Sequence, residues 1–228
     1  MTEKFRFVCA TRGSYDDFFK KSPLGRSLSI YQAPFAEVTL FDQNTRGLPA
    51  LYNEALRDAD SDPAILIFIH DDVHLCDFFW HVHLLAGLQK FDIVGLAGNR
   101  RRLPGQPSWY FKDAGLTPDT AENLSGIVAH GKGFPPSNLS SFGQPAQRVQ
   151  LLDGVLLAAR SRTLRSHEIE FDERFDFHFY DLDFCRQAER KQLRMGTWTL
   201  SAIHESEGSF GAPQWREGYR RYLEKWKS

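Results

Sequence analysis

A histidine and two aspartates follow directly on a short, strongly apolar stretch of the chain. Residues 64–69 read Ala-Ile-Leu-Ile-Phe-Ile and lead into His70, Asp71 and Asp72. An apolar run of this length after a turn signal predicts a strand buried on both faces, and it is too short for a buried helix. If the strand stays extended, His70, Asp72 and His74 share one side and Asp71 faces the other. Imidazole and carboxylate ligands together suit a divalent cation such as Mn²⁺ or Mg²⁺.

The alternative for this stretch is a solvated turn at the end of a strand. Two more distant groups bear on the choice. Asp181 and Asp183 follow an aromatic stretch and begin a predicted helix over residues 182–191, where acids could also serve only to cap and charge the helix. His204 ends a predicted strand over residues 195–203, and its alternative role is that of a hydrogen-bonded structural histidine.

Composition limits the protein class. A chain of 228 residues with 42% hydrophobic residues predicts one domain with an ample core. The net charge of −1 gives no general case for binding nucleic acid or anionic membranes. The three cysteines, Cys9, Cys76 and Cys185, have no zinc or disulfide spacing. The first residues lack the apolar core of a signal peptide, and no apolar run approaches the roughly 20 residues of a membrane span. We therefore expect a cytoplasmic protein.

Strands and helices alternate along the first part of the chain. The pattern predicts strands over residues 5–10, 37–41, 64–69 and 91–97, with helices from Tyr15 and over residues 48–56 and 78–90 between them. After residue 148 it predicts strand character over residues 149–160 and a final helix over residues 215–226. The expected fold class is α/β, with a mainly parallel twisted sheet and helices on both faces.

The middle segment, residues 98–147, breaks this pattern because it is rich in Gly, Pro, Ser and Asn. Long loops in compact domains are usually functional or mobile. We interpret this one as a functional segment between an N-terminal part, residues 1–97, and a C-terminal part, residues 148–228. Among its flexible residues it carries the aromatic side chains Trp109, Tyr110, Phe111 and Phe134. Arg100, Arg101 and Arg102 could meet phosphate, but a solvated charge run is favoured.

In their order along the chain, these motifs resemble the nucleotide-diphospho-sugar glycosyltransferases of the A-type, Rossmann-like fold, close to family two and its glycosyltransferase-like relatives. Nearly the whole chain takes part in the resemblance. The stretches that carry it are residues 47–55, residues 68–73, Asp153-Gly154-Val155, residues 171–175 and His204. The resemblance implies a metal-dependent, inverting transferase that takes a nucleotide-diphospho-sugar donor and a saccharide or other hydroxyl acceptor. It also implies a nucleotide-binding half, residues 1–97, a catalytic half, residues 148–228, and between them an acceptor-binding lid, residues 98–147, whose aromatic side chains could stack on a sugar.

The resemblance also implies a role for each group. The family's DxD metal motif falls on His70 and Asp72, so that a histidine replaces the leading aspartate. Asp72 is then the best candidate ligand for Mn²⁺ or Mg²⁺, Asp71 a ribose contact, and His204 the residue that completes the metal sphere. A cation there would act as a Lewis acid on the diphosphate leaving group.

An inverting transfer needs a general base, which the family places in a Glu-Asp pair at the start of a helix. Tyr180 and Asp181 occupy these positions, so Asp181 is the predicted base. Because Tyr180 departs from the family's pattern, Asp183 remains a rival. Asp153 matches a family position near the acceptor, although Asp-Gly is also an ordinary turn.

The nucleotide is expected over the ends of the first two strands. The candidate contacts there are Ala10, Thr11, Arg12, Asp42 and Asn44. Asn53 matches a family asparagine, whereas Tyr52 stands where the family commonly has arginine, which puts a phosphate contact at that position in doubt.

Two other functions compete with sugar transfer. A metal-dependent phosphoesterase could be built on His70, Asp72, His74 and His204, and it would need two adjacent metals and no nucleotide. A protein that binds sugar nucleotides without catalysis would also fit, since both the metal motif and the base motif depart from the family.

Overall fold

The computed structural model describes residues 3–206, 208 and 210–227. Its larger sheet has seven strands in the order β2-β1-β3-β11-β5-β12-β9. β1 pairs in parallel with β2 and β3, and β5 pairs in parallel with β12, whereas β11 runs antiparallel to both β3 and β5. The strands are β1 Phe5–Ala10, β2 Ala36–Phe41, β3 Ile65–Ile69, β5 Ile93–Gly95, β9 Arg148–Val149, β11 Leu156–Arg160 and β12 Met195–Thr197.

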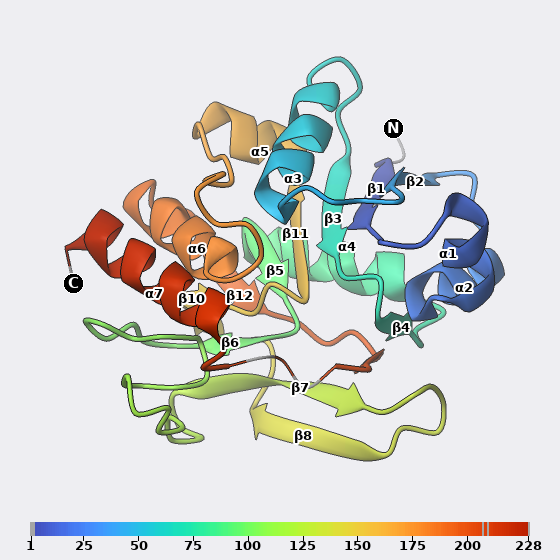
Figure 1. The fold of residues 1–228 in the computed structure, drawn as a ribbon. Coiled ribbons are helices and arrows are strands. Elements are labelled where there is room, and N and C mark those ends of the chain that lie inside the picture. Colours follow the sequence, from blue (N-terminus) through green and yellow to red (C-terminus); the bar gives the residue numbers. More distant parts are fainter. Residues whose placement is uncertain (1–2, 207, 209, 228) are drawn as a thin grey trace.

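The smaller sheet lies below the larger one in Figure 1 and has the order β10-β6-β7-β13-β4, with β8 paired to β7. Its strands are β4 Val73–Leu75, β6 Ala97–Asn99, β7 Leu124–His130, β8 Asn138–Gly143, β10 Leu151–Leu152 and β13 Ala202–His204. The segment interpreted as a lid therefore supplies β7, β8 and most of β6, so that it is partly built into a sheet.

Helices α3, Leu48–Asp58, and α4, Trp80–Lys90, cover opposite faces of the larger sheet. Trp80 packs on Phe7 of β1, and Phe7 is level with Ile67 of β3. Tyr52 of α3 packs on Phe68, the next residue of β3. Because successive side chains of a strand point to opposite faces, the two helices lie on opposite sides. The α/β class predicted from the sequence is confirmed.

The remaining helices are α1 Tyr15–Lys21, α2 Pro23–Ile30, α5 Ser161–Ser166, α6 Tyr180–Arg190 and α7 Pro213–Trp226. Helices α6 and α7 lie side by side in Figure 1 and are joined by an aromatic cluster in which Phe179 contacts Trp215, Tyr219 and Tyr222. Within the part of the chain that the structure describes, no helix has both the length and the apolar character needed to cross a bilayer.

The chain leaves the larger sheet for the smaller one at four points: β3 to β4, β5 to β6, β9 to β10, and β12 to β13. The expectation that the central strand stays extended beyond His70 is therefore wrong. β3 ends at Ile69, a turn contains Asp71 and Asp72, and β4 belongs to the other sheet. Likewise, the predicted strands over residues 91–97, 149–160 and 195–203 are each divided where the chain crosses.

Candidate active site

The turn that carries His70, Asp71 and Asp72 is fixed by backbone hydrogen bonds to three different parts of the fold. The His70 N–H donates to the carbonyl of Val155, at 3.2 Å, beside β11. The carbonyl of Asp71 accepts from Leu24 of α2, and that of Asp72 accepts from Glu205, which follows β13. Three consecutive residues are thus anchored to both sheets and to one helix, which makes their side-chain positions well defined.

His70, Asp72 and His204 come together at this turn. One ligand atom from each lies within 4.8 Å of the others. His204 is brought there by the antiparallel pairing of β13 with β4, in which His204 is level with Val73. All three residues are half-buried, so the cluster keeps access to solvent. The sequence-predicted metal ligands are therefore adjacent in space.

The electrostatics of the cluster are those of a cation site. Burial opposes the charged form of Asp72, but the close approach of His204 outweighs burial and lowers the pKa of Asp72 to about 2. Burial also lowers the pKa of His70, which keeps its imidazole neutral and able to coordinate. Burial would lower the pKa of His204 too, but the carboxylate of Asp72 raises it overall.

An unsatisfied oxygen shows that these residues fit a cation. Asp72 Oδ1 is buried and has no hydrogen-bond partner among the described residues. His204 Nε2 is 3.4 Å from it and hydrogen-bonds instead with Ser206 Oγ, at 3.0 Å. A buried carboxylate oxygen without a partner is costly unless a charge or a metal meets it. Two imidazoles with one carboxylate favour Mn²⁺ over Mg²⁺, which prefers oxygen ligands.

His74 does not join this cluster. It lies in β4, beyond the turn, and its Nε2 is 3.0 Å from Glu205 Oε1. The rival phosphoesterase site required His74 beside His70 and Asp72, on the assumption of a continuous strand. The turn at Asp71 and Asp72 removes that alignment, so this set of four ligands is not formed.

Asp181 lies in the first turn of α6, as the sequence predicted for the base. Its Oδ2 accepts a hydrogen bond from the Gly154 N–H at 3.1 Å, and its Oδ1 accepts from the Leu182 N–H at 2.9 Å. Burial, and then the charge of Asp153, raise the pKa of Asp181 to about 7. A carboxylate with this pKa accepts a proton readily near neutral pH, which is the property that a general base needs.

Two backbone features hold Asp181 in place. Phe179, which precedes α6, has a left-handed conformation with φ of 70°, and its ring is buried among the aromatic side chains of α7. Gly154 lies directly against the start of α6, because a Cβ at that residue would come within 2.4 Å of the Tyr180 hydroxyl and 3.0 Å of the Asp181 Cβ. Only glycine permits this approach. Asp153, the neighbour of Gly154, bears electrostatically on both Asp181 and His70.

Asp183 faces away from this site, although it is only two residues from Asp181. Its side chain is fully buried. Oδ1 accepts from Trp226 Nε1 at 2.9 Å and pairs with Lys225 Nζ, and Oδ2 accepts from Gln187 Nε2 at 2.7 Å. Oδ1 thus joins α6 to α7 and Oδ2 is bonded within α6, so both oxygens are engaged, which is a physical reason against Asp183 as the rival base.

Replacing Asp183 by alanine should destabilise the protein by about 2 kcal/mol or more, because it leaves the Trp226 N–H without its acceptor and removes one of the two carboxylates that pair with the largely buried Lys225 ammonium, whose other partner is Asp172. Urea unfolding followed by circular dichroism measures this. The control is Asp16→Ala, which removes an exposed pair with Lys20 and should cost less than about 1 kcal/mol. Equal small losses in the two variants would show that Asp183 is not a structural anchor.

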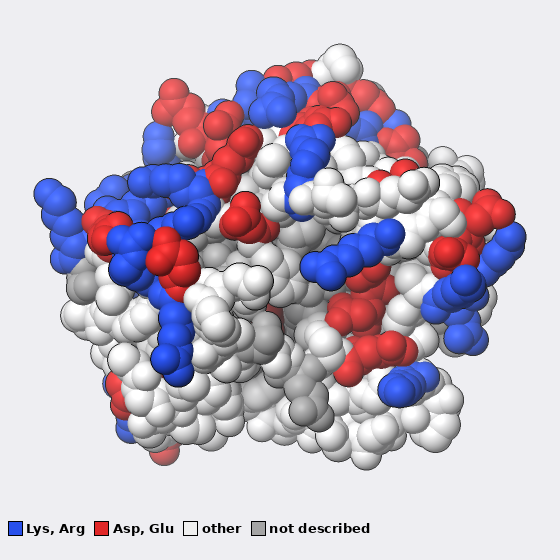
Figure 2. Space-filling view, in the orientation of Figure 1, with Lys and Arg blue, Asp and Glu red and all other residues white. Residues whose placement is uncertain are grey.

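A cleft of about 1580 Å³ adjoins the cluster. Among its lining residues are four of the predicted nucleotide contacts, Ala10, Thr11, Arg12 and Asn44, together with Asp71. Burial raises the pKa of Asp71, and the Thr11 hydroxyl opposes this shift. In Figure 2, acidic side chains gather in a hollow over the junction of β3 and β4, with basic side chains around its edge.

Two predicted nucleotide contacts do not line the cleft. The Asp42 carboxylate accepts from the Tyr15 N–H at 2.9 Å and so caps the start of α1. Asn53 is buried, and its amide exchanges hydrogen bonds with the backbone of Phe171. Asn53 lies on the inward face of α3, where its amide reaches the backbone of Phe171 rather than the cleft. It therefore positions the segment that leads from Phe171 to α6.

The structure adds residues that sequence reasoning did not select. Phe177 stacks on His70, with ring centroids 5.5 Å apart, and it also lines the cleft. His130 ends β7 beside His204, and its Nδ1 is buried without a hydrogen-bond partner among the described residues. Arg46, Arg174 and Arg221 also line the cleft. Only the pairing of distant strands reveals His130, whereas Phe177 lies in the aromatic stretch that precedes Asp181.

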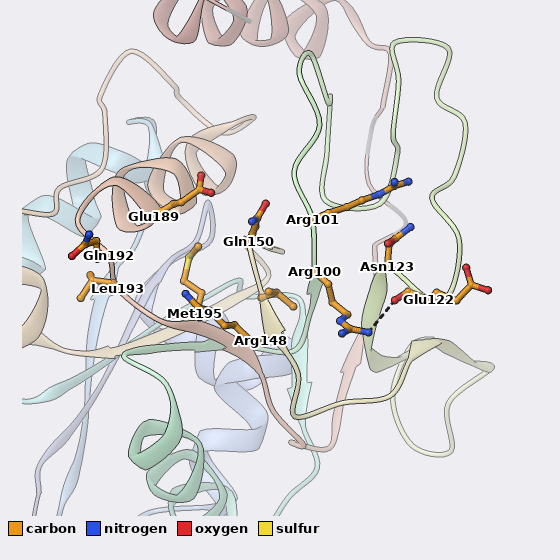
Figure 3. A pocket seen from close by; sticks show the side chains of 11 residues that line it. Arg100, Arg101, Glu122, Asn123, Arg148, Gln150, Glu189, Gln192, Leu193 and Met195 are labelled. Atoms are coloured by element: carbon orange, nitrogen blue, oxygen red, sulfur yellow. Dashed lines mark hydrogen bonds between the residues drawn. The ribbon is translucent and has the colours of Figure 1, made fainter.

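A second cavity, of about 770 Å³, lies by the C-terminal end of α6, away from Asp181. In Figure 3, Arg100 donates to the Glu122 carbonyl, and Glu189 and Gln192 project from the other wall. The neighbouring Arg101 pairs with Asp119 at 2.6 Å, and Arg102 pairs with Glu189 at 3.0 Å. Arg101 and Arg102 thus form ion pairs that anchor the segment they belong to, whereas the sequence favoured a solvated run of charges.

Comparisons with known proteins agree with this geometry. A family model described as a glycosyltransferase-like family matches residues 29–208. A search of curated protein sequences finds no match.

Solved structures share the fold at low sequence identity. Residues 1–349 of TarS from S. aureus superpose with a TM-score of 0.51 and 14% identity, covering 89% of this chain and 60% of that one. The catalytic domain of Drosophila beta1,4-galactosyltransferase 7, in complex with xylobiose, gives 0.52 and 10%, covering 96% and 80%. GalNAc-T7 with UDP, GalNAc and Mn²⁺ gives 0.53 and 10%, covering 97% and 48%. The chain thus spans less than two thirds of TarS 1–349 and of GalNAc-T7.

Proposed function

Because the chain belongs to the glycosyltransferase-like family, we propose that it transfers a sugar from a nucleotide-diphospho-sugar to an acceptor hydroxyl, with inversion and with a divalent cation. The observation that carries the proposal is the turn of His70, Asp71 and Asp72. Asp71 lines the large cleft, while its two neighbours form the cation cluster with His204. One turn therefore joins a cleft of nucleotide size to a site suited to the cation that neutralises a diphosphate.

The donor would lie along the cleft, with its ribose at Asp71 and its phosphates toward Arg12. The Arg12 guanidinium is exposed and has no ion-pair partner among the described residues, whereas the other cleft arginines pair with acids: Arg46 with Glu54, Arg174 with Asp172 and Arg221 with Glu217. Ala10 and Thr11 would face the base or ribose beside it. TarS 1–349 and GalNAc-T7 were both solved with UDP, which makes UDP-sugars the first donors to test.

His70, Asp72 and His204 would hold the cation, preferably Mn²⁺. When bound, a cation there supplies Lewis-acid stabilisation of the negative charge that develops on the leaving diphosphate. His70 is held by Tyr180 and stacked by Phe177, and His204 is held by Ser206, so the ligands are oriented in advance.

Asp181 would act as the base. The acceptor oxygen attacks the anomeric carbon as the bond from that carbon to the diphosphate breaks, and the hydroxyl proton passes to the Asp181 carboxylate. A single displacement of this kind inverts the configuration. Asp153, half-buried beside Gly154, is placed to contact the acceptor and keeps the pKa of Asp181 high.

The first test is a binding and turnover screen. Calorimetric titration of UDP-sugars with and without Mn²⁺ should show binding that depends on the ion, and incubation with saccharide acceptors should release UDP together with a glycosylated product. Release of free sugar without an acceptor would favour hydrolysis, and Mn²⁺-dependent binding without any turnover would identify a non-catalytic sugar-nucleotide-binding protein. Absence of binding for every sugar nucleotide tested would refute the proposal.

The lid is proposed to be the turn between β7 and β8, residues 131–137. Phe134 is 85% exposed, and the turn follows His130, whose ring centroid is 6.3 Å from that of His204, which supports a lid at this turn. Trp109, by contrast, is buried against Phe142. Donor and Mn²⁺ should therefore slow hydrogen exchange in residues 131–137 more than around Trp109. Equal exchange in this turn with and without ligands would indicate a fixed wall.

A further inference from the structure

The hydroxyl of Tyr180 has two hydrogen-bond partners, and together they determine where the protons are. Its oxygen lies 2.8 Å from the Gly154 carbonyl and 3.0 Å from His70 Nε2. A carbonyl oxygen can only accept, so the single proton of the hydroxyl points to Gly154. The hydroxyl then has only lone pairs to offer His70. His70 must therefore donate, and its Nε2 must carry the hydrogen.

A neutral imidazole with a hydrogen on Nε2 has its free lone pair on Nδ1. We propose that Tyr180 is a positioning residue that holds His70 in this form and so presents Nδ1 to the divalent cation. This inference rests on the cation site of the proposed function. It assigns a role to Tyr180, which occupies the position of the glutamate in the family's Glu-Asp pair.

Neighbouring side chains hold His70 and Tyr180 in this hydrogen-bonded arrangement. Tyr180 is only 2% exposed, and Phe177 covers one face of the His70 ring. The Gly154 carbonyl accepts a hydrogen bond from the Tyr180 hydroxyl, and the Gly154 N–H donates one to Asp181. The backbone of one glycine therefore fixes both Tyr180, which bonds to His70, and Asp181, the proposed base. Partners that orient metal-bound histidines in this way typically change metal affinity by about 10- to 100-fold when they are removed.

The variant that tests the proposal is Tyr180→Phe, which deletes the hydroxyl and keeps the ring. The matched control is Tyr52→Phe. Tyr52 is equally buried and packs 5.8 Å from the Tyr180 ring, but it is the Tyr180 hydroxyl, not that of Tyr52, that bonds to His70 and to the Gly154 carbonyl. Both variants remove one buried oxygen from the same aromatic region, so a general effect on packing should appear in both.

The first measurement is ¹⁵N NMR of metal-free protein with labelled histidine, in which His70→Gln assigns the His70 signals. The wild type and Tyr52→Phe should show a protonated Nε2 and an unprotonated Nδ1, and Tyr180→Phe should show a mixture of the two forms. A protonated Nδ1 in the wild type would overturn the proposal without touching the proposed function, because no cation is involved.

The second measurement is calorimetric titration with Mn²⁺ alone. Tyr180→Phe should bind Mn²⁺ about 10- to 100-fold more weakly than the wild type, and Tyr52→Phe should bind like the wild type. Equal affinity of Tyr180→Phe and wild type would overturn the positioning role and leave the cation site standing. Absence of Mn²⁺ binding by the wild type would overturn both this inference and the cation of the proposed function.

Discussion

Replacing Asp181 by asparagine should lower the rate of sugar transfer by at least about a hundredfold, because asparagine keeps the size of the side chain but cannot accept the acceptor proton. The proposed donor site is formed by the cleft and by the cluster of His70, Asp72 and His204, so donor affinity should change little. Transfer is measured as release of the nucleoside diphosphate under donor saturation, and donor affinity by calorimetry. Unchanged transfer in Asp181→Asn would place the base elsewhere, with Asp153 as the next residue to replace.

The pKa of Asp181 gives this prediction a signature in pH. With a pKa of about 7, the wild-type rate should rise with pH through neutrality and then level, because only the ionised carboxylate accepts a proton. The folded-state pKa lies above the unfolded value, so the native protein holds an extra proton between about pH 4 and pH 7. Stability from this group is therefore present at low pH and is lost as pH rises toward 7.

Asp181→Asn removes that dependence. Between pH 5 and pH 7 the free energy of unfolding of the wild type should fall relative to the variant by on the order of 2 kcal/mol. Urea unfolding at the two pH values measures the difference between the proteins, and any constant cost of the substitution cancels. A parallel pH dependence of the two proteins would show that Asp181 has an ordinary pKa and is poorly suited to act as a base.

Replacing Asp72 by alanine should abolish Mn²⁺-dependent donor binding. Loss of a residue that only orients a ligand typically costs about 10- to 100-fold in metal affinity, and loss of a ligand itself should cost more than that. Asp72 Oδ1 has no hydrogen-bond partner among the described residues, so the fold should survive the substitution. Calorimetric titration with Mn²⁺ and with a UDP-sugar measures the loss, and circular dichroism checks the fold.

The control for Asp72→Ala is His74→Ala. His74 is close in sequence but pairs with Glu205 outside the cluster, so its replacement should leave Mn²⁺ affinity nearly unchanged. His204→Ala should weaken Mn²⁺ binding more mildly than Asp72→Ala, because the one negatively charged ligand remains. Mn²⁺ binding that is retained by Asp72→Ala but lost in His74→Ala would contradict the assignment of ligands.

The grouping of His70, Asp72 and His204 was predicted from a local signal for the first two residues and from the family resemblance for His204. Residues 64–69 are apolar without interruption, which indicates a buried strand, and the polar residues that follow such a strand lie at its carboxyl end. The choice of Asp181 as base followed from the family resemblance, which places the base at a helix start. Asp183, the rival, is held by Lys225 and Trp226 of α7. That contact joins distant segments and has no local signal.

The smaller sheet was the part that local patterns missed. Its strands are short, and several contain glycine or serine, such as Gly126, Ser140 and Gly143, which are poor strand formers by propensity. They are held by pairing with neighbours: Gly126 has no room for a side chain against the Leu96 carbonyl. Asn53 was misassigned for a related reason, because an inward-facing amide looks the same in sequence whether it meets a ligand or the backbone of Phe171.

The four crossings of the chain between the sheets have a mechanical consequence. His70 follows β3 of the larger sheet, and His204 belongs to β13 of the smaller one. An ion bound by both residues would therefore link the two sheets directly. Filling the site should therefore hold the two sheets together more firmly, and a chelator should loosen β13 and β4 before it affects β1 or β3.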